Sequence, residues 1–439
     1  MPQRQRPLAD SALAASTVGD RAATGCGMQG PGTRPTLSFG RGLGIRPFRD
    51  RDDPVRSGNV PFSITPRGNS VQVPHFPQPA ALESEAMNRA KNAQTPFLID
   101  VSRWRENPWA IGGSSVRPKG RSGLTTLELC AGGGGQALGL EQAGIEHAAL
   151  LEFDAGCCET LRLNRPKWRV INGDLKTFDA SEFAGIELVS AGLPCPPFSV
   201  AGKQLGAKDE RNLFPAMVRV VDTVRPKAVM IENVRGILGA VFDDYRKDVM
   251  RQLKKLGYQT GWRLMNACDF GVPQLRPRVV FVAILNEYAD RFSWPSGSLK
   301  PPITVGEVLY DLMAAGGWIG AKAWKERANE IAPTIVGGSH KHGGPDLGPT
   351  RARRAWETLG VDGKGIVDAP PPKDFVGMPR LTIPMVARLQ GFPDDWRFFG
   401  SKTRAYRQVG NAFPPPFARA VAEKIRLCLS AQSSVQVAG

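Results

Sequence analysis

The sequence has few residues suited to metal sites or disulfide frameworks, and it lacks any long apolar run. Its 7 cysteines and 4 histidines are scattered along 439 residues, and no CxxC pair occurs. A zinc ribbon and a disulfide framework are therefore excluded, and reduced cysteines in a cytoplasmic protein are expected. No stretch approaches the ~18 consecutive apolar residues of a transmembrane helix, and MPQRQRPLADSALAAS lacks the apolar segment of a secretory signal. We expect neither membrane insertion nor export.

Acidic residues are also in short supply. The chain carries 57 Lys and Arg against 41 Asp and Glu, a net charge of +16, and residues 1–120 hold 16 of the basic and 9 of the acidic side chains. Such an excess favours a polyanionic partner, most often nucleic acid, with an anionic membrane or a merely solvated basic surface as alternatives. A hydrophobic fraction of 41% is enough for a packed core.

The composition divides the chain into regions. Residues 1–120 are rich in Pro, Gly, Arg and Ser, which predicts a largely disordered basic extension with a local helix near 81–93. Over 121–286, apolar runs alternate with helical spacing, which predicts a buried, mostly parallel α/β sheet. Strands are expected within 124–130, 148–153, 168–174, 186–192, 227–234 and 278–285, and helices within 136–144, 213–224 and 245–257.

The strand–helix alternation stops after residue 286. Residues 287–379 are rich in Gly, Pro, Lys and Arg, and they predict a second, smaller and irregular domain. Residues 380–430 regain amphipathic spacing over 384–392 and 415–429, which indicates helices.

A glycine-rich loop follows the first expected strand. In CAGGGGQA, Gly132, Gly134 and Ala137 fit the GxGxx(G/A) pattern, in which glycine lets the backbone approach a nucleotide closely. Glu152 ends the next expected strand, where a carboxylate can accept hydrogen bonds from ribose hydroxyls, and its neighbour is Phe153. Asp174 after the third strand is suited to an adenine amino group. These residues predict an adenosine cofactor without separating NAD from S-adenosylmethionine; a glycine turn without a ligand is the alternative.

A cysteine between prolines follows the fourth expected strand. The segment LPCPPFS holds Cys195 in a stiff loop just outside the carboxyl end of a strand, where open α/β sheets bind substrates. A thiolate there is suited to nucleophilic attack. A small buried hydrophobe is the usual role of a lone cysteine, and we assign that role to Cys26, Cys157, Cys158, Cys268 and Cys428.

Charged side chains follow two further apolar strands. Glu232 in ENV is expected to be partly desolvated, which raises its protonated population and suits it to share a proton with a ring nitrogen. In QLRPR, Arg276 and Arg278 alternate and so would share a strand face, suited to a phosphate or a carbonyl oxygen. A salt-bridged carboxylate and a solvated arginine pair are the alternatives.

Together these motifs resemble the DNA (cytosine-5) methyltransferase family. LELCAGGGGQALGLEQAG resembles its cofactor motif and LPCPPFS its nucleophile motif, and the later motifs follow in the family's order over 124–429. The later matches are ENVRG, QLRPRVVFVA, RLTIPMVARLQGFPDDW and YRQVGNAFPPPFARAV.

The resemblance implies a Rossmann-like, doubly wound methyltransferase fold, with residues 287–379 as a target recognition domain and 380–430 returning to the catalytic domain at 121–286. It implies that Cys195 is the nucleophile, Glu232 the acid at the cytosine ring and Arg278 the contact to the base carbonyl, with Arg276 supporting the site. It also implies a pocket for S-adenosylmethionine lined by Cys130, Gly132, Gly134, Glu152, Phe153, Asp174 and Asn411.

The resemblance is not complete. Cys130 stands where the family usually has an aromatic residue, and Pro196 follows the nucleophile where glutamine is usual. Phe413 follows GNA where a smaller aliphatic residue is common. These departures affect stacking and loop closure, but they remove no group that the chemistry requires.

The implied reaction is methylation of a flipped cytosine in double-stranded DNA through a covalent bond between Cys195 and C6. The implied setting is a bacterial restriction–modification system with a cognate endonuclease as partner, and the enzyme is expected to be a monomer. The segment 332–336 resembles the core of the recognition region, where DNA contacts are expected from Lys341, Arg351, Arg353 and Arg354. An NAD-dependent oxidoreductase, an RNA cytosine methyltransferase and a non-catalytic DNA-binding module are the alternatives.

Overall fold

The computed structural model describes residues 123–194, 209–298, 301–338 and 344–430. The extension at 1–120 and the helix expected near 81–93 therefore lie outside the described residues. Within the described ranges, no helix is both long and apolar enough to cross a membrane.

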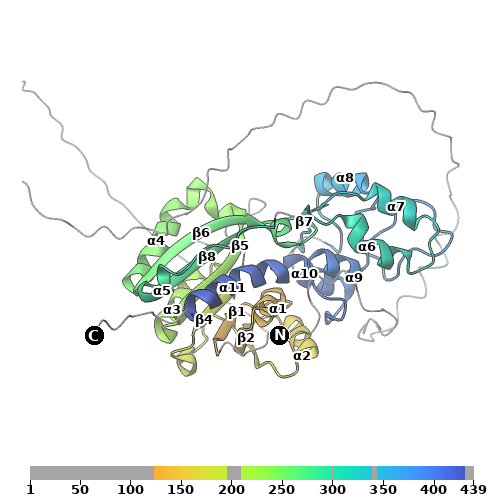
Figure 1. Ribbon diagram of the computed structural model, residues 1–439. Coiled ribbons are helices and arrows are strands. Elements are labelled where there is room, and N and C mark those ends of the chain that lie inside the picture. The colour runs from red at the N-terminus through yellow and green to blue at the C-terminus, as the bar shows by residue number, and fades with distance from the viewer. Residues whose placement is uncertain (1–122, 195–208, 299–300, 339–343, 431–439) are drawn as a thin grey trace, which may run out of the picture. The chain divides into compact units, whose positions relative to one another are not determined.

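A seven-stranded sheet is the centre of the described chain (Figure 1). Its order is β3-β2-β1-β4-β5-β8-β6; the neighbours from β3 to β5 are parallel, and β8 is antiparallel to both β5 and β6. The predicted, mostly parallel α/β sheet is thus confirmed. The strands are β1 (Thr125–Leu129), β2 (Glu146–Glu152), β3 (Val170–Asn172), β4 (Leu188–Gly192), β5 (Ala228–Val234), β6 (Tyr258–Asn266) and β8 (Pro277–Leu285).

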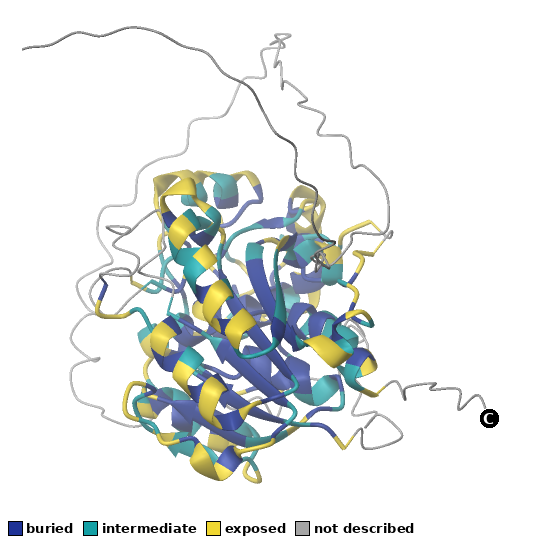
Figure 2. Cartoon of the chain, turned by 90° about the vertical axis from the view of Figure 1, so that its left-hand side faces the viewer, coloured by how far each residue is buried: buried dark blue, intermediate teal, exposed yellow. Residues whose placement is uncertain are grey.

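Helices cover both faces of this sheet, whose strands are largely buried (Figure 2). Apolar residues of α3 (Phe214–Val224) and α4 (Asp243–Lys255) share one core with Leu127 and Leu129 of β1. On the other face, α11 (Pro415–Ser430) and α5 (Asn286–Ala289) share a core with Met230 and Val282. Helix α1 (Gly135–Gln142) packs on α11. Because successive strand residues point to opposite faces, each apolar strand contributes to both cores.

The sequence patterns missed several elements of this region. They include β6, α5, α2 (Ala155–Asn164) and α10 (Lys402–Asn411). Strand β6 is an edge strand that carries half-buried and exposed residues along most of its length, so it lacks the continuous apolar run of the central strands. Asp154 caps α2 by accepting a hydrogen bond from the Cys157 N–H at 3.1 Å.

The region after the sheet, here called the helical region, consists of short helices joined by irregular segments, which agrees with the expected smaller, irregular second domain. It contains α6 (Val305–Ala314), α7 (Ala321–Arg327), the short strand β9 (Ala332–Pro333) and α8 (Thr350–Thr358). Trp324 and Trp356 are buried in its core together with residues of α9 (Ile383–Leu389) and α10. Thr304 and Glu307 form a capping box at the start of α6. Short helices between Gly- and Pro-rich turns concealed this pattern.

The packing also shifts the boundary between the two regions. The expected boundary at 286/287 falls inside α5, and Phe292 and Trp294 still pack in the core beneath α11. The strand β7 (Gln274–Leu275), which precedes β8, pairs with β9. The strand β7, before β8, is therefore joined to the region after the sheet, whereas residues 286–294, after β8, pack with the sheet.

A buried acidic group lies within the sheet, away from the expected catalytic residues. Glu128 on β1 is fully buried, and its Oε2 is 3.1 Å from Nε2 of His147 on β2. Burial raises the pKa of Glu128, and the hydrogen bond to His147 acts in the opposite direction. A raised carboxyl pKa means that the folded chain binds this proton more tightly than the unfolded chain does.

Stability should therefore fall as pH rises above the ordinary carboxyl pKa, and Glu128→Gln should remove that loss. Each unit by which folding raises the pKa of Glu128 corresponds to about 1.4 kcal/mol in the free energy of unfolding. Thermal unfolding measured from about pH 5 to about pH 8 should show a smaller decline in Tm for the variant than for the wild type. The exposed Glu146→Gln on β2 is the control. Equal pH slopes for wild type and Glu128→Gln would contradict the assignment.

Candidate active site

The predicted site residues follow strands that end at one edge of the sheet. β1 leads into the glycine loop, β2 ends at Glu152, and β5 carries Glu232. β4 leads to Pro194, whereas Cys195 lies outside the described residues. Since β1 and β4 are adjacent and the chain winds to opposite sides from them, this edge is where α/β sheets bind ligands.

The glycine loop is shaped by segments from the far end of the sequence. Gly134 precedes α1 with a left-handed φ of 87°, which favours glycine. A Cβ on Gly135 would lie 2.3 Å from the carbonyl oxygen of Phe413, so the helix start contacts the segment leading to α11. The indole Nε1 of Trp396 donates to the Gly133 carbonyl at 3.1 Å. Trp396 occurs in a recognised motif, but no pattern in the sequence had linked it to this loop.

An open space lies at Gly132, beside a fixed carboxylate. Among the described residues, apart from Gly132 and its two chain neighbours, no atom lies within 4 Å of the position that a Cβ on Gly132 would occupy. The Gly132 N–H donates to Oε2 of Glu152 at 2.7 Å, and the Asp154 N–H donates to Oε1 at 2.8 Å. Burial raises the pKa of Glu152, and these two N–H groups act in the opposite direction. The carboxylate is thus held in one orientation at the border of the open space.

The remaining residues of the expected cofactor pocket on β1–β3 lie nearby. Burial raises the pKa of the Cys130 thiol, and the carboxylates of Glu152 and Asp174 raise it further, so both carboxylates are within electrostatic reach of Cys130. Phe153 follows Glu152 and is 73% exposed, so its ring is accessible to a ligand. A neutral thiol, two carboxylates and an accessible ring can together bind an adenosine moiety.

The side chain of Asn411, also expected in the cofactor pocket, forms its hydrogen bond with the segment after β9. The side chain is exposed, and its Nδ2 donates to the carbonyl of Gly338 at 3.2 Å, in the segment after β9. The following residues, Ala412 and Phe413, contact the glycine loop at Gly135. The motif therefore reaches the loop through its backbone, and the cofactor contact of the Asn411 side chain stays a prediction.

Glu232 and Arg278 form a buried ion pair at the end of β5. Oε1 of Glu232 lies 2.7 Å from Nε of Arg278, and the two side chains are 6% and 12% exposed. The antiparallel register of β5 and β8 pairs Val234 with Arg278 and so brings the guanidinium to this edge. Burial raises the pKa of Glu232, and the charges of Arg278 and Arg276 oppose that rise. The result is a desolvated carboxyl beside a fixed cation, which is suited to proton exchange.

Arg276 does not lie beside Arg278 on a strand face, contrary to expectation. It precedes β8, it is completely buried, and its guanidinium donates to three backbone carbonyls. The acceptors are Ile335 at 2.6 Å, Gly410 at 2.8 Å and Ala412 at 3.0 Å. Both terminal nitrogens therefore bind backbone carbonyls of the protein itself, which does not favour a contact of Arg276 to a phosphate or a substrate carbonyl. The charge of Arg276 also acts on Glu232, and its supporting role stays a prediction.

Asn233 is a site residue that sequence analysis did not assign. It is 1% exposed, and its Nδ2 donates to the carbonyl of Leu193 at 3.5 Å. Leu193 precedes Cys195 by two positions, so Asn233 fixes the start of the segment that carries the cysteine. Its position beside Glu232 in ENV was the available signal.

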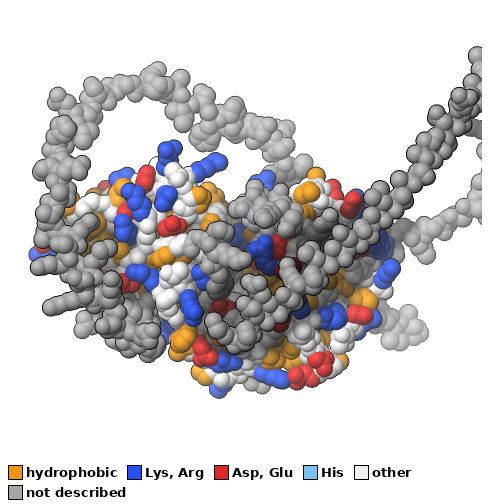
Figure 3. Space-filling model, turned by 180° about the vertical axis from the view of Figure 1, so that it is seen from behind, with side chains coloured by type: hydrophobic (Ala, Val, Ile, Leu, Met, Phe, Trp, Pro, Cys, Tyr) orange, Lys and Arg blue, Asp and Glu red, His pale blue; other side chains and the backbone are white. Residues whose placement is uncertain are grey.

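The expected DNA-contact residues are only partly described. Lys341 lies outside the described residues, whereas Arg351 and Arg354 are exposed on α8 and Arg353 on the same helix is half-buried. On the face shown in Figure 3, Lys and Arg side chains are interspersed with Asp and Glu.

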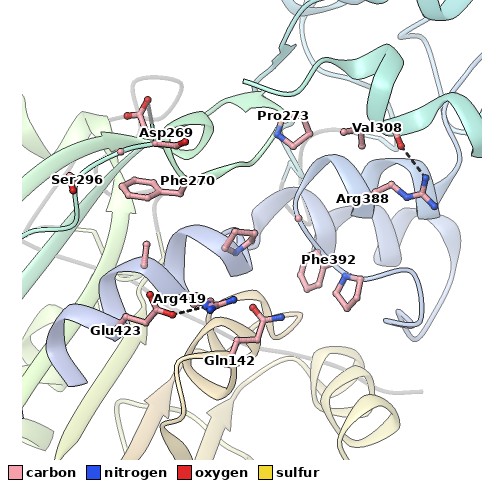
Figure 4. Close-up of a pocket in the computed structure, with 16 residues that line it drawn as sticks. Gln142, Asp269, Phe270, Pro273, Ser296, Val308, Arg388, Phe392, Arg419 and Glu423 are labelled. Carbon is pink, nitrogen blue, oxygen red and sulfur yellow. Dashed lines mark hydrogen bonds and ion pairs between the residues drawn. The ribbon is translucent and has the colours of Figure 1, made fainter. Parts of the chain in front are cut away.

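A cavity of about 370 Å³ lies away from these residues, between the start of α11, the end of α9 and the segment 269–273 (Figure 4). Its charged side chains have internal partners: Arg419 pairs with Glu423 at 2.7 Å, and Arg388 pairs with Asp394 at 2.6 Å. None of the predicted site residues that the structure describes lines it, so the strand edge is the better candidate for chemistry.

Comparison with known proteins agrees with this geometry. Two curated relatives are the Type II methyltransferase M.NaeI from Lentzea aerocolonigenes, 54% identical over 70% of this chain and 76% of the relative, and M.NgoMIV from Neisseria gonorrhoeae, 53% identical over 69% and 97%. The crystal structure of a prophage-encoded E. coli protein described as a DNA modification methyltransferase matches with a TM-score of 0.52 at 21% identity. It covers 70% of this chain and all of that one, and it supports the α/β methyltransferase fold.

The family model of C-5 cytosine-specific DNA methylases matches residues 124–427, from the first strand to the last helix. That range includes the glycine loop, the cysteine segment, the Glu232–Arg278 pair and the region that contacts Arg276. The chain therefore belongs to the C-5 cytosine-specific DNA methylase family and is a DNA (cytosine-5) methyltransferase.

Proposed function

We propose that this enzyme transfers a methyl group from S-adenosylmethionine to C5 of a cytosine flipped out of a specific double-stranded DNA site. The observation that carries the proposal is the buried Glu232–Arg278 pair at the end of β5, beside the strand that leads to Cys195. Cytosine C5 is a weak nucleophile, and this set of groups can activate it.

Activation begins with the nucleophile. The Cys195 thiolate forms a bond to C6 while the Glu232 carboxyl holds a proton at N3, so electron density moves to C5. Arg278 hydrogen-bonds to the base carbonyl and keeps Glu232 oriented. After methyl transfer, loss of the C5 proton and departure of the thiolate from C6 restore the aromatic ring.

The residues at the end of β1 and β2 fit the cofactor. Open space at Gly132, the fixed Glu152 carboxylate and the exposed ring of Phe153 match an adenosine group. Gly134 allows the close turn, and Cys130, Asp174 and Asn411 complete the proposed pocket. When bound, S-adenosylmethionine supplies an electrophilic methyl group to the site.

DNA recognition is the role we propose for the helical region within 287–379. Flipping a base costs a few kcal/mol, which Lys and Arg contacts to phosphates offset. Arg351 and Arg354 are accessible for such contacts on α8. The two curated relatives are named Type II methyltransferases, which supports a role in protecting bacterial DNA from a cognate restriction endonuclease. We further propose that the enzyme acts as a monomer in the cytoplasm.

Replacement of the nucleophile tests the reaction. Cys195→Ser should abolish methyl transfer but leave S-adenosylmethionine binding within about twofold, since the hydroxyl is a far weaker nucleophile. Random-sequence DNA incubated with labelled cofactor, followed by base-resolution mapping of 5-methylcytosine, gives activity and target together. Cys268→Ser in the 3₁₀ turn Ala267–Phe270 is the control and should remain active. Full activity of Cys195→Ser, or methylation of tRNA in preference to DNA, would overturn the proposal.

Replacement of the proton-sharing carboxyl should slow the chemical step. Glu232→Gln should lower kcat about 10²- to 10⁴-fold, the usual contribution of acid–base catalysis. Because the protonated carboxyl is the active form, the wild-type rate should decline as pH rises through the raised pKa of Glu232, and the variant should lose that decline. Glu187→Gln, at the opposite end of the same sheet, is the control. A near-normal kcat for Glu232→Gln would exclude the acid role.

The cofactor assignment can be tested without turnover. Glu152→Gln should weaken S-adenosylmethionine binding by about 1.5–3 kcal/mol, roughly 10- to 150-fold in Kd, because a charge-assisted hydrogen bond to the ribose is lost. Isothermal titration calorimetry measures this directly. The exposed Glu159→Gln on α2 should bind as the wild type does. An unchanged Kd for Glu152→Gln would place the ribose elsewhere.

A further inference from the structure

Three long polar side chains are completely buried where the catalytic sheet meets the helical region. Gln274 on β7, Arg276 before β8 and Gln390 after α9 all have 0% exposure. Figure 1 shows β7 at the end of the sheet that faces α6–α8. Burial of such groups is unfavourable unless their hydrogen bonds are satisfied, and each additional bond fixes the geometry of its partners.

The two glutamines are joined directly. Nε2 of Gln274 donates to Oε1 of Gln390 at 2.6 Å and to the Leu389 carbonyl at 3.2 Å. Nε2 of Gln390 donates to the carbonyls of Val409 and Ala412, each at 3.0 Å. Each amide thus uses both of its N–H donors, which leaves little freedom for alternative rotamers.

The third partner is the backbone of Ile335, which follows β9. Its N–H donates to Oε1 of Gln274 at 2.8 Å, and its carbonyl accepts from Arg276 at 2.6 Å. Backbone pairing of β7 with β9 reinforces this contact, with Gln274 opposite Ala332. The segment that follows β9 is therefore held through both backbone polar groups of one residue, Ile335.

These hydrogen bonds also connect to two parts of the candidate active site. One is the start of β8, which carries Arg278, and the other is the segment 410–412, which leads to the glycine loop. Arg276 is separated by one residue from Arg278, the partner of Glu232. Arg276 and Gln390 bind the carbonyls of Gly410 and Ala412, which flank Asn411. A displacement of Ile335 is thus transmitted through two side chains to the strand start that carries Arg278.

We propose that Gln274, Arg276 and Gln390 form a positioning network that couples the helical region to the Glu232–Arg278 pair. DNA bound to the helical region at its correct site then aligns the catalytic carboxyl of Glu232. The network touches no reacting atom and acts through Arg278. The inference rests on the proposed methyl transfer to DNA. It assigns specificity for the target site to buried residues as well as to those that face DNA.

Gln274→Met tests the network in the full-length enzyme. Methionine fills a similar volume but removes the bonds to Ile335, Leu389 and Gln390. We expect kcat on target DNA to fall about 10- to 100-fold, as for other displacements of catalytic groups by distant changes. Base-resolution mapping should show a larger share of methylation at near-cognate sites. The Kd for S-adenosylmethionine should stay within about twofold, because Gln274 makes no bond to 409–412.

A remote buried hydrogen bond provides the control. Tyr258 on β6 is 2% exposed, and its hydroxyl donates to the Pro226 carbonyl at 2.6 Å. Tyr258→Phe should lower Tm without changing kcat or site preference. If Gln274→Met behaves in the same way, with lower Tm but unchanged kcat and site preference, Gln274 has only a structural role and the proposal is overturned.

Two further variants guard against misfolding and test the coupling. Gln274→Glu keeps the acceptor for the Ile335 N–H beside the cation Arg276 and, even when its carboxyl is protonated, removes one of the two donors to Leu389 and Gln390, so it should still lose site preference. Gln390→Met combined with Gln274→Met should lower kcat little more than the worse single change, because the two share one bond. Additive effects would refute the network. A wild-type enzyme that forms no 5-methylcytosine would instead refute the proposed function, which separates the two failures.

Discussion

The reversed direction of β8 is the constraint on which the catalytic arrangement depends. In a wholly parallel sheet, the residue at the start of a strand would lie at the edge opposite the ligand site. Because β8 is antiparallel to β5, its second residue, Arg278, lies beside Glu232 instead. The reversal also brings Gln274 and Arg276, which precede β8, to the same edge. One change of strand direction thus provides both the ion pair and the connection to the helical region.

The sequence predicted the features that depend on local pattern. Central strands such as β4 and β5 appear as continuous apolar runs because both of their faces are covered, and Glu232 could be placed at a strand end for that reason. The error at Arg276 arose because alternation indicates a shared face only within one strand. Its acceptors at Ile335 and Gly410 come from distant segments, and no local pattern encodes such contacts. The edge strand β6 was missed because its side chains are only partly covered.

The distribution of the charged residues and their ion pairs also change how the net charge of +16 is interpreted. Residues 380–430 contain 9 Lys and Arg against 3 Asp and Glu, so much of the basic excess outside the extension belongs to the C-terminal segment rather than to α8 and its surroundings. Part of it is neutralised internally, since Arg380 pairs with Asp362 and Arg388 with both Asp311 and Asp394. Arg397 and Arg404 are exposed. A count of charges therefore overstates the charge that is presented to a polyanion.

The contact between α1 and the segment before α11 has a consequence for biosynthesis. A Cβ on Gly139 would lie 2.5 Å from the Pro415 carbonyl oxygen, and Gly135 approaches Phe413 as closely, so these backbones pack directly on each other. During translation the glycine loop emerges from the ribosome early, but the surface that shapes it is made near the end. The glycine loop can consequently reach the packing seen here only after α11, the last helix, has been synthesised and docked.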